Sequence, residues 1–397
     1  MNDQASDAPS YRVAVITGPP APYREPVFAE LARRPGIELK VFHASTGHAD
    51  LGWKATTSTN RDFDHVFLEN YMPERGRRLP AVGYLSLGLP AELTAFRPDY
   101  LIVYGYNQLS QWLAFRYAMT HRVPFALRSD SNVHLDGSET WQSSIRRRLV
   151  YQLVRRAHAV LPVGSANRMY WQKYGAADAQ IFMAPYAIDN EKVARLVGER
   201  SDNDTSAPLR LLYIGRLLPR KGVDLLLEAF NRFAEKTPAT LTIVGDGPER
   251  ARLESMQTPK AREQTYWRGK LPNEEAMRAM RDADLFVLPS RYEPWGLVVN
   301  EAMAAGLPVV AHRDVGAAID LIEDTVHGWI LPSLSADAIY EAMNAAAGDR
   351  EHLAQMGAMA RERVQAWSIG RTVDGMVAAV MDGCRSMPAS RKRVMNA

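Results

Sequence analysis

Two carboxylates flank the start of a predicted helix, and their positions suit a ligand that carries both phosphate and hydroxyl groups. Glu293 and Glu301 enclose the stretch "PWGLVVN", in which Gly296 opens the helix and Gly306 ends it. The run "LFVLPS" at 285–290 predicts a buried strand just before them. Glu293 therefore lies on the loop at a strand's carboxyl end, and Glu301 lies over a turn inside the helix. Open α/β sheets bind ligands at this edge, and a helix N-terminus can hold a phosphate there.

A second pattern of this kind lies in "LRLLYIGRLLPRKGVDLLLEAF". The predicted strand ends at Gly215, Arg216 and Lys221 follow on the loop, and Gly222 precedes a helix. A glycine at a strand end lets a ligand approach the backbone, and two cations before a helix N-terminus can close around a diphosphate. Arginine offers paired hydrogen bonds, whereas lysine offers a mobile point charge. Taken alone, the stretch is equally consistent with solvated surface charge.

Two further patterns are weaker. Gly245 and Gly247 follow a strand in "LTIVGDGPER", but Arg250 stands where a dinucleotide-binding fingerprint needs its third glycine. We interpret this segment as a tight turn, either beside a ligand or purely structural. Asp282 and Asp284 have the spacing of metal ligands, but they come at a helix end before a buried strand. Helix capping and solvated charge explain them better, and the sequence predicts no metal site.

Short apolar runs alternate with helix-length segments almost throughout, which predicts parallel, doubly wound sheets. In the first half the strand-like runs are "YRVAVIT", "IELKVFH", "DYLIVYG", "VPFALRS", "AHAVLPV" and "AQIFMAP". In the second half they are "LRLLYIG", "ATLTIVG", "DLFVLPS", "LPVVAH" and "GWILP". The polar stretch "GERSDNDTSAP" separates the two series like a linker. The chain is therefore expected to be an α/β protein of two Rossmann-like βαβ domains with a cleft between them.

Composition limits the functional classes. The 397 residues, 46% of them hydrophobic, are enough for two packed cores, and a net charge of +3 is too mild to indicate nucleic-acid binding. Cys384 is the only cysteine, which excludes an intrachain disulfide and any cysteine-based zinc or iron–sulfur site. The first ten residues are polar and acidic, unlike a signal peptide, and no apolar run approaches the length of a membrane span. We expect a cytoplasmic protein, with a peripheral contact at the inner membrane face as an open alternative.

The three patterns of the second half occur together and in order: strand–Gly–Arg–Lys–Gly, strand–Gly-x-Gly, and two glutamates around Pro-Trp-Gly. In this combination the chain resembles the retaining, nucleotide-sugar-dependent glycosyltransferases of family 4, which have the GT-B fold. The first half resembles them only in its general layout. The resemblance implies two Rossmann-like domains facing a central cleft and a C-terminal helix that crosses back to the first domain. The implied segments are a disordered 1–10, an acceptor-side domain 11–189, a donor-binding domain 190–367, the crossing helix 368–385 and a disordered basic tail 386–397.

The resemblance also implies roles for individual residues. Glu293 would contact the donor sugar near the reacting carbon, Glu301 would hold the ribose, and Arg216 and Lys221 would clamp the diphosphate. Backbone amides from Trp295 through Gly296 and Leu297 to Val298 would meet the sugar and the diphosphate. The other implied ligand-side positions are Gly215 and Gly245 at strand ends, Arg268 and Leu271 at the nucleobase, Gly18 near the diphosphate, and Asp130 on the acceptor side. Tyr104 and Arg128 stand where relatives often carry histidine, and Pro19-Pro20 replaces a glycine pair.

The expected activity is transfer of a sugar, with retention of configuration, from a nucleotide diphosphate sugar to an acceptor hydroxyl. UDP-sugar is the favoured donor and GDP-sugar the alternative, and the product would be a glycan, a glycolipid or a glycosylated metabolite. Arg216, Lys221 and the helix N-terminus would stabilise the departing diphosphate, so neither a metal nor a cofactor beyond the co-substrate is expected. Catalysis by this chain would rest on Glu293, Arg216 and Lys221.

Two alternatives stay open. A catalytically silent GT-B subunit could bind nucleotide-sugar for a partner protein. Such a subunit would not need to keep four charged residues, namely Glu293, Glu301, Arg216 and Lys221. A Rossmann oxidoreductase is disfavoured because neither half has the full glycine fingerprint after its first strand. The basic clusters "RGRR" (75–78) and "RRR" (146–148) could face an anionic membrane, although solvated helix faces explain them better.

Overall fold

The structure is a computed structural model that describes residues 10–48, 53–54, 62–71, 83–133, 141–198 and 207–386. It separates into two compact units. Unit 1 takes in the described residues of Met1–Val163, Asn167–Pro185 and Ile369–Ala397, and unit 2 those of Gly164–Ala166 and Tyr186–Ser368. Apart from Ser10 and Ser386, the predicted disordered ends and the "RGRR" cluster lie outside the described residues.

Unit 1 is built on a six-stranded parallel sheet with the order β5-β2-β1-β6-β7-β8. Its strands are β1 (Tyr11–Thr17), β2 (Ile37–His43), β5 (Asp64–Phe67), β6 (Tyr100–Tyr104), β7 (Phe125–Arg128) and β8 (Ala159–Val160). A separate antiparallel pair is formed by β3 (Gly47–His48) and β4 (Trp53–Lys54). The middle of β1 (13–16) and all of β6 are apolar and buried, as expected for central strands of a sheet with helices on both faces.

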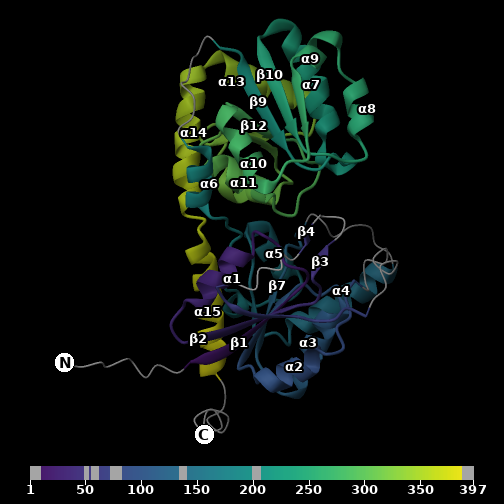
Figure 1. Ribbon diagram of the computed structural model, residues 1–397, viewed down its shortest axis with the longest axis vertical. Helices are drawn as coiled ribbons and strands as arrows, with labels where there is room; N and C mark the ends of the chain where they lie inside the picture. Colours follow the sequence, from purple (N-terminus) through teal and green to yellow (C-terminus); the bar gives the residue numbers. More distant parts are fainter. Residues whose placement is uncertain are drawn as a thin grey trace, which may run out of the picture. The chain divides into compact units, whose positions relative to one another are not determined.

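The helices of unit 1 form two layers (Figure 1). One layer shares a core with one face of the sheet and consists of α2 (Leu89–Phe96), α3 (Leu109–Thr120), α4 (Trp141–Val154) and α5 (Ser165–Lys173). The other layer consists of α1 (Glu25–Ala32) and α15 (Ile369–Arg385). A short 3₁₀ turn, η4, lies at Asp178–Gln180. The C-terminal helix α15 thus belongs to the core of the first unit, and its Gly375 lies so close to the Met183 carbonyl that no larger residue fits.

Unit 2 repeats the architecture with the strand order β11-β10-β9-β12-β13-β14, again all parallel. Its strands are β9 (Leu209–Ile214), β10 (Ala239–Val244), β11 (Thr265–Gly269), β12 (Leu285–Leu288), β13 (Val309–His312) and β14 (Gly328–Leu331). Its helices are α6 (Asn190–Val197), η5 (Pro219–Lys221), α7 (Val223–Lys236), α8 (Arg250–Ser255), α9 (Pro259–Glu263), α10 (Asn273–Arg278), η6 (Ala279–Asp282), α11 (Leu297–Ala304), α12 (Gly316–Leu321), α13 (Ala336–Gly348) and α14 (Arg350–Gln365). The predicted α/β class with two Rossmann-like domains is confirmed.

The strand prediction differs from the structure in three details. The two-residue strands β3 and β4 were not predicted. The run "AQIFMAP" forms no strand, because only Ile181 reaches the sheet, through a single bridge to Val160. The edge strand β5 was missed, since "DHVF" is short, half-polar and only partly buried, and so lacks the apolar signal of a central strand.

Candidate functional site

Four loops meet at the carboxyl edge of the unit 2 sheet, after β9, β10, β12 and β13. The loops after β9 and β10 pack backbone to backbone: Gly215 N–H donates to the Val244 carbonyl at 3.0 Å, and Leu217 N–H to the Asp246 carbonyl at 3.0 Å. A side chain at Gly245, whose φ is +142°, would collide with the Gly215 carbonyl oxygen. The Gly-x-Gly pattern therefore has a structural reason, which is to let the loop that carries Arg216 lie against its neighbour.

A cluster of three cations and one carboxylate forms where the loops after β9 and β12 meet. The Lys221 ammonium is ion-paired with Glu293, and the Arg220 guanidinium lies 3.2 Å from the same carboxylate. The Glu293 and Lys221 side chains are only 13% and 11% exposed, so this pair is largely shielded from water. Arg216 is exposed and has no ion-pair partner among the described residues. With Glu293 ionised, the cluster carries a net charge of +2, which matches a diphosphate.

Burial lowers the pKa of Lys221, and the nearby charges of Arg220 and Arg216 act in the same direction. The Glu293 carboxylate opposes this effect by stabilising the ammonium. Glu293, or a bound anion, therefore favours the charged form of Lys221. Arg220 was not among the predicted site residues, because one arginine beside a lysine in a loop gives no signal of its own.

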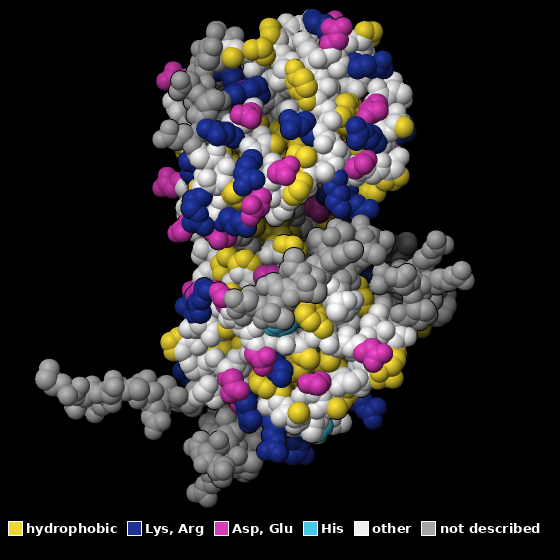
Figure 2. All heavy atoms as spheres, viewed as in Figure 1, with side chains coloured by type: hydrophobic (Ala, Val, Ile, Leu, Met, Phe, Trp, Pro, Cys, Tyr) yellow, Lys and Arg dark blue, Asp and Glu magenta, His cyan; other side chains and the backbone are white. Residues whose placement is uncertain are grey.

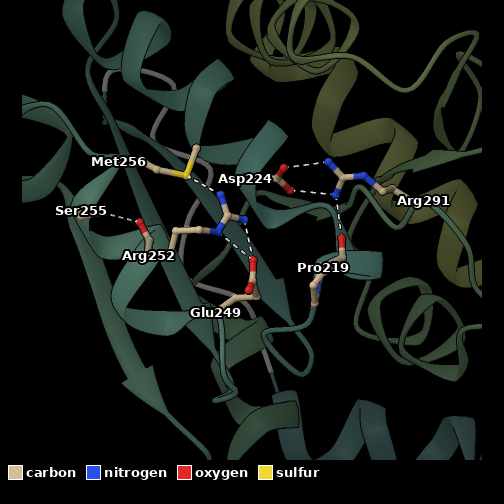
Figure 3. A network of polar contacts seen from close by, with 7 residues as sticks. All are labelled: Pro219, Asp224, Glu249, Arg252, Ser255, Met256 and Arg291. Carbon is tan, nitrogen blue, oxygen red and sulfur yellow. Dashed lines mark hydrogen bonds and ion pairs between the residues drawn. The ribbon is translucent and has the colours of Figure 1, made fainter.

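Arg291 ties the two loops of this cluster together. Its guanidinium forms a two-pronged ion pair with Asp224 at 2.8 and 2.7 Å and donates to the Pro219 carbonyl at 2.7 Å (Figure 3). Its backbone N–H donates to the Arg220 carbonyl at 2.8 Å. Since Asp224 begins α7 and Pro219 begins η5, Arg291 holds the segment that presents Lys221 against the loop that presents Glu293. Arg291 is therefore a positioning residue, and nothing in the sequence distinguished it from other surface arginines.

Arg291→Ala is expected to lower kcat/KM for the nucleotide-sugar donor by about ten- to hundredfold, because a small displacement of reacting groups has effects of this size. The fold should survive, since the pair is partly exposed and contributes little to stability. Steady-state kinetics and thermal unfolding would measure the two effects separately.

Arg252 provides the matched control for this prediction. Two nitrogens of its guanidinium donate to one carboxylate oxygen of Glu249, at 2.8 and 2.6 Å (Figure 3). This ion pair links the start of α8 to its own helix and holds no site loop. Arg252→Ala should leave kcat/KM near that of the wild type. Equal effects of the two substitutions would show that Arg291 does not position the cluster.

The N-terminus of α11 completes the cluster. Gly296 adopts a left-handed conformation, with φ +94°, that favours glycine, and it supplies no capping side chain. The N–H groups of Leu297 and Val298 in the first turn have no acceptor among the described residues. They are free to bind an anion, and the helix dipole favours one. Trp295, in contrast, has its indole buried, with its N–H donating to Asn300 at 2.9 Å, so only its backbone faces the site.

Glu301 lies in α11, half-buried, and its carboxyl group has no hydrogen-bond or ion-pair partner in the described chain. Burial alone raises the pKa of Glu301 to about 7. A shielded carboxyl without a protein partner is destabilising unless a ligand supplies hydrogen-bond donors. Two adjacent hydroxyl groups, as on a ribose, are donors of this kind.

Glu301→Gln is expected to raise stability above pH 7. In the folded protein this carboxyl stays protonated up to about pH 7, whereas in the unfolded chain it ionises near 4.5. The folded state therefore holds the extra proton between these values, and stability falls as the pH rises through this window. The variant should match the wild type below pH 4.5 and exceed it above pH 7, by about 3 kcal/mol at most. Chemical denaturation across pH would measure this; equal curves at pH 8 would contradict the assignment.

Arg268 and Leu271, the residues predicted at the nucleobase, both line a cavity of about 310 Å³ in unit 2. The cavity extends from the turn after β11 beneath α10. Its other lining residues are Leu212, Thr242, Glu275, Arg278, Ala279, Asp282 and Ala283. The structure thus brings the two predicted residues together, and their contact with a base stays a prediction.

The candidate residues in the first half of the chain lie in different surroundings. Gly18 is buried, and a side chain there would contact the Gln108 amide at 3.6 Å, so the loop after β1 passes close to the start of α3. Asp130 is exposed. Arg128 is buried, donates to the Ala184 carbonyl at 2.5 Å and lies over the Tyr104 ring. Its guanidinium is thus committed to the interior of unit 1.

Asp284 corrects one interpretation. It neither caps a helix nor stands in solvent, but lies buried between Arg210 at 2.7 Å and Arg350 at 2.8 Å. These two cations keep the pKa of Asp284 below its usual range despite burial. Within the described residues, no group of three or more His, Cys, Asp or Glu side chains is arranged to hold a metal ion.

Part of the chain is similar in sequence to known glycosyltransferases. Residues 199–363 match the family described as glycosyl transferases group 1. An uncharacterized glycosyltransferase of Methanocaldococcus jannaschii is 36% identical over 124 residues, which are 31% of this chain and 32% of that protein. A GDP-mannose-dependent alpha-(1-6)-phosphatidylinositol monomannoside mannosyltransferase of Mycolicibacterium smegmatis is 31% identical over 225 residues, 51% of this chain and 56% of that protein.

Solved structures extend the likeness to the whole fold. Anabaena HepE, solved in complex with UDP and glucose, matches with a TM-score of 0.68 over 94% of this chain and 99% of its own, at 19% identity. The chain spans about half or less of the length of the curated relatives it matches. The fold is GT-B, and the match to glycosyl transferases group 1 falls within residues 199–363.

Proposed function

We propose that this chain is a family 4 glycosyltransferase that moves a sugar from a nucleotide diphosphate sugar to an acceptor hydroxyl and retains the anomeric configuration. The observation that carries this proposal is the cluster of Arg216, Arg220, Lys221 and Glu293 beside the uncapped N-terminus of α11. The match of residues 199–363 to glycosyl transferases group 1 supports it, as does the sequence similarity to a mannosyltransferase.

The chemistry follows from these charges. When the bond between the anomeric carbon and the diphosphate oxygen breaks, the electron pair leaves with the diphosphate and positive charge grows on the sugar. The negative charge on the departing diphosphate is stabilised by Arg216, Lys221 and the α11 amides. The positive charge on the sugar is stabilised by the Glu293 carboxylate. The acceptor oxygen forms the new bond from the same face, and its proton passes to a diphosphate oxygen. No protein nucleophile takes part.

The donor is proposed to be a UDP-sugar, with a GDP-sugar as the alternative. HepE was solved with UDP, and the Mycolicibacterium relative is named for its dependence on GDP-mannose. The acceptor is a hydroxyl group of a glycan, a glycolipid or a metabolite. We place the reaction in the cytoplasm; no helix in the described part of the chain is long and apolar enough to cross a bilayer.

Activity is expected to survive chelation of divalent metals. Three cations and a helix N-terminus take the place that Mg²⁺ or Mn²⁺ has in metal-dependent transferases. Turnover measured with and without EDTA should agree within error. Complete loss in EDTA that either metal restores would contradict this mechanism.

The function is tested by incubating the protein with a panel of nucleotide-sugars without acceptor and measuring the free nucleotide diphosphate released. Slow release from one uridine or guanosine donor is expected, since water can replace the acceptor. Release from none, together with tight donor binding, would favour the alternative of a silent subunit that serves a partner protein. Binding of a nicotinamide cofactor instead would favour an oxidoreductase.

A further inference from the structure

A long segment of unit 1 is cationic and lacks acidic residues. Between positions 141 and 177 the sequence contains seven lysine and arginine residues and no aspartate or glutamate. Helix α4 contains the densest part of this segment, including Arg146, Arg147 and Arg148. Runs of charged residues are usually only solvated surface. This run therefore indicates a binding surface only if the structure shows a second feature at the same place.

The second feature is a set of exposed aliphatic side chains on the same helix. Ile145 is 52% exposed and Leu149 is 50% exposed, although both are large and apolar. They are four residues apart and therefore share one face of α4. The opposite face of α4 packs in the core of unit 1 through Val150, Leu153 and Val154. The exposed aliphatic face is thus additional to the one that holds the helix to the sheet.

Arginines border this face. Arg148 lies beside Leu149, and Arg155 and Arg156 directly follow the last residue of α4. All three are exposed and have no carboxylate partner among the described residues. Arg155 lies over the ring of Tyr151, which is 41% exposed. On the visible face of unit 2, in contrast, cationic and acidic side chains are interspersed (Figure 2).

We propose that this face of α4, defined by Ile145, Arg148, Leu149, Arg155 and Arg156, docks on an anionic lipid bilayer. Arginines alone would suit any polyanion, but two half-exposed aliphatic side chains among them suit a surface with charged headgroups above an apolar interior. Tyr151 has the amphipathic character that such an interface favours. The helix lies on the surface and does not span the bilayer. The inference does not depend on the proposed transferase activity.

Co-sedimentation with vesicles tests the inference. The wild type is expected to bind vesicles of phosphatidylcholine mixed with phosphatidylglycerol, to bind pure phosphatidylcholine weakly, and to dissociate as salt is raised. The double variant Arg148→Glu and Arg155→Glu should bind the anionic vesicles more weakly than the wild type, by more than about fivefold for each substituted position. About fivefold in affinity is the contribution of one cation near an anionic surface. Ile145→Gln with Leu149→Gln should weaken it by about tenfold.

Matched controls exist in the chain. Leu87→Gln changes an equally large residue of unit 1 that is 58% exposed, and Arg195→Glu with Arg262→Glu makes the same change of net charge in unit 2. Both controls should bind vesicles like the wild type. Failure of the wild type to bind anionic vesicles, or full binding by the Ile145 and Leu149 variant, would overturn the inference. Equal affinity for heparin and for the vesicles would also overturn it, in favour of a general polyanion site.

A second probe reports the contact directly and leaves all the arginines of the α4 face in place. Because Cys384 is buried, a new surface cysteine can be labelled selectively with an environment-sensitive fluorophore. The label at Ile145→Cys should shift its emission to the blue with anionic vesicles, while the label at Leu87→Cys should not. No shift at position 145, in a protein that does bind, would place the contact elsewhere and overturn the inference.

Discussion

Glu293→Gln is expected to lower kcat and kcat/KM together, by about 100-fold, while the nucleotide diphosphate still binds. The substitution keeps the size and the hydrogen-bonding capacity of the side chain but removes its charge. In the proposed reaction this charge acts on the sugar only as positive charge develops, and the loss of one such contact has an effect of this size. A parallel fall in both constants is the signature of an interaction made mainly in the transition state.

The pairing of Glu293 with Lys221 adds a second expectation for this variant. With glutamine at position 293, Lys221 is held less tightly and remains available to the diphosphate, so the affinity for free nucleotide diphosphate should not fall. Glu301→Gln should behave in the opposite way, with a raised donor KM, weaker nucleotide binding and a smaller change in kcat. Calorimetric titration of both variants would decide: weaker nucleotide binding by Glu293→Gln than by Glu301→Gln would contradict the assigned roles.

Lys221→Ala is expected to lower kcat/KM by about 100- to 1,000-fold. Two effects combine, because the variant loses a diphosphate contact and leaves the shielded Glu293 carboxylate with Arg220 as its one remaining ion-pair partner among the described residues. Steady-state kinetics with the nucleotide-sugar donor measure the loss directly.

Arg220→Ala is the control for Lys221→Ala. Arg220 contacts the same carboxylate, but its side chain is 44% exposed, so solvent screens its contribution and the loss should be much smaller. Combining Lys221→Ala with Glu293→Gln should cost less than the sum of the two single effects, because both belong to one cluster. Additive effects, or equal losses at positions 220 and 221, would show that the shielded pair does not act as a unit.

The sequence was sufficient to predict the two parallel sheets, because runs such as "LRLLYIG" and "DLFVLPS" are continuous and apolar and end in glycine, proline or serine. It also placed Arg216, Lys221 and Glu293 on loops at strand ends. It could not predict that Lys221 contacts Glu293, which is 72 positions away, because this contact depends on β9 and β12 being neighbours in the sheet. Strand patterns in a sequence do not specify strand order.

Burial and other long-range contacts could not be predicted from the sequence either. Arg128 and Asp284 look like surface charges in the sequence, yet both are buried against partners from distant segments. Arg291 stays partly exposed, but its partner Asp224 is also distant in the sequence. The unusual pKa of Glu301 likewise depends on what packs around α11. In each of these cases the local residues are compatible with a solvated side chain, and only tertiary packing decides otherwise.

The central claim is that the nucleotide diphosphate binds on the β9 loop without a metal. The most direct test is calorimetric titration of UDP and GDP, in buffer with EDTA, into the wild type and into a double variant with Arg216→Ala and Lys221→Ala. The wild type is predicted to bind at least one of the two, uridine first, and the double variant to bind it at least about 100-fold more weakly. Equal affinity in both proteins, or no binding by the wild type until a divalent metal is added, would contradict the claim.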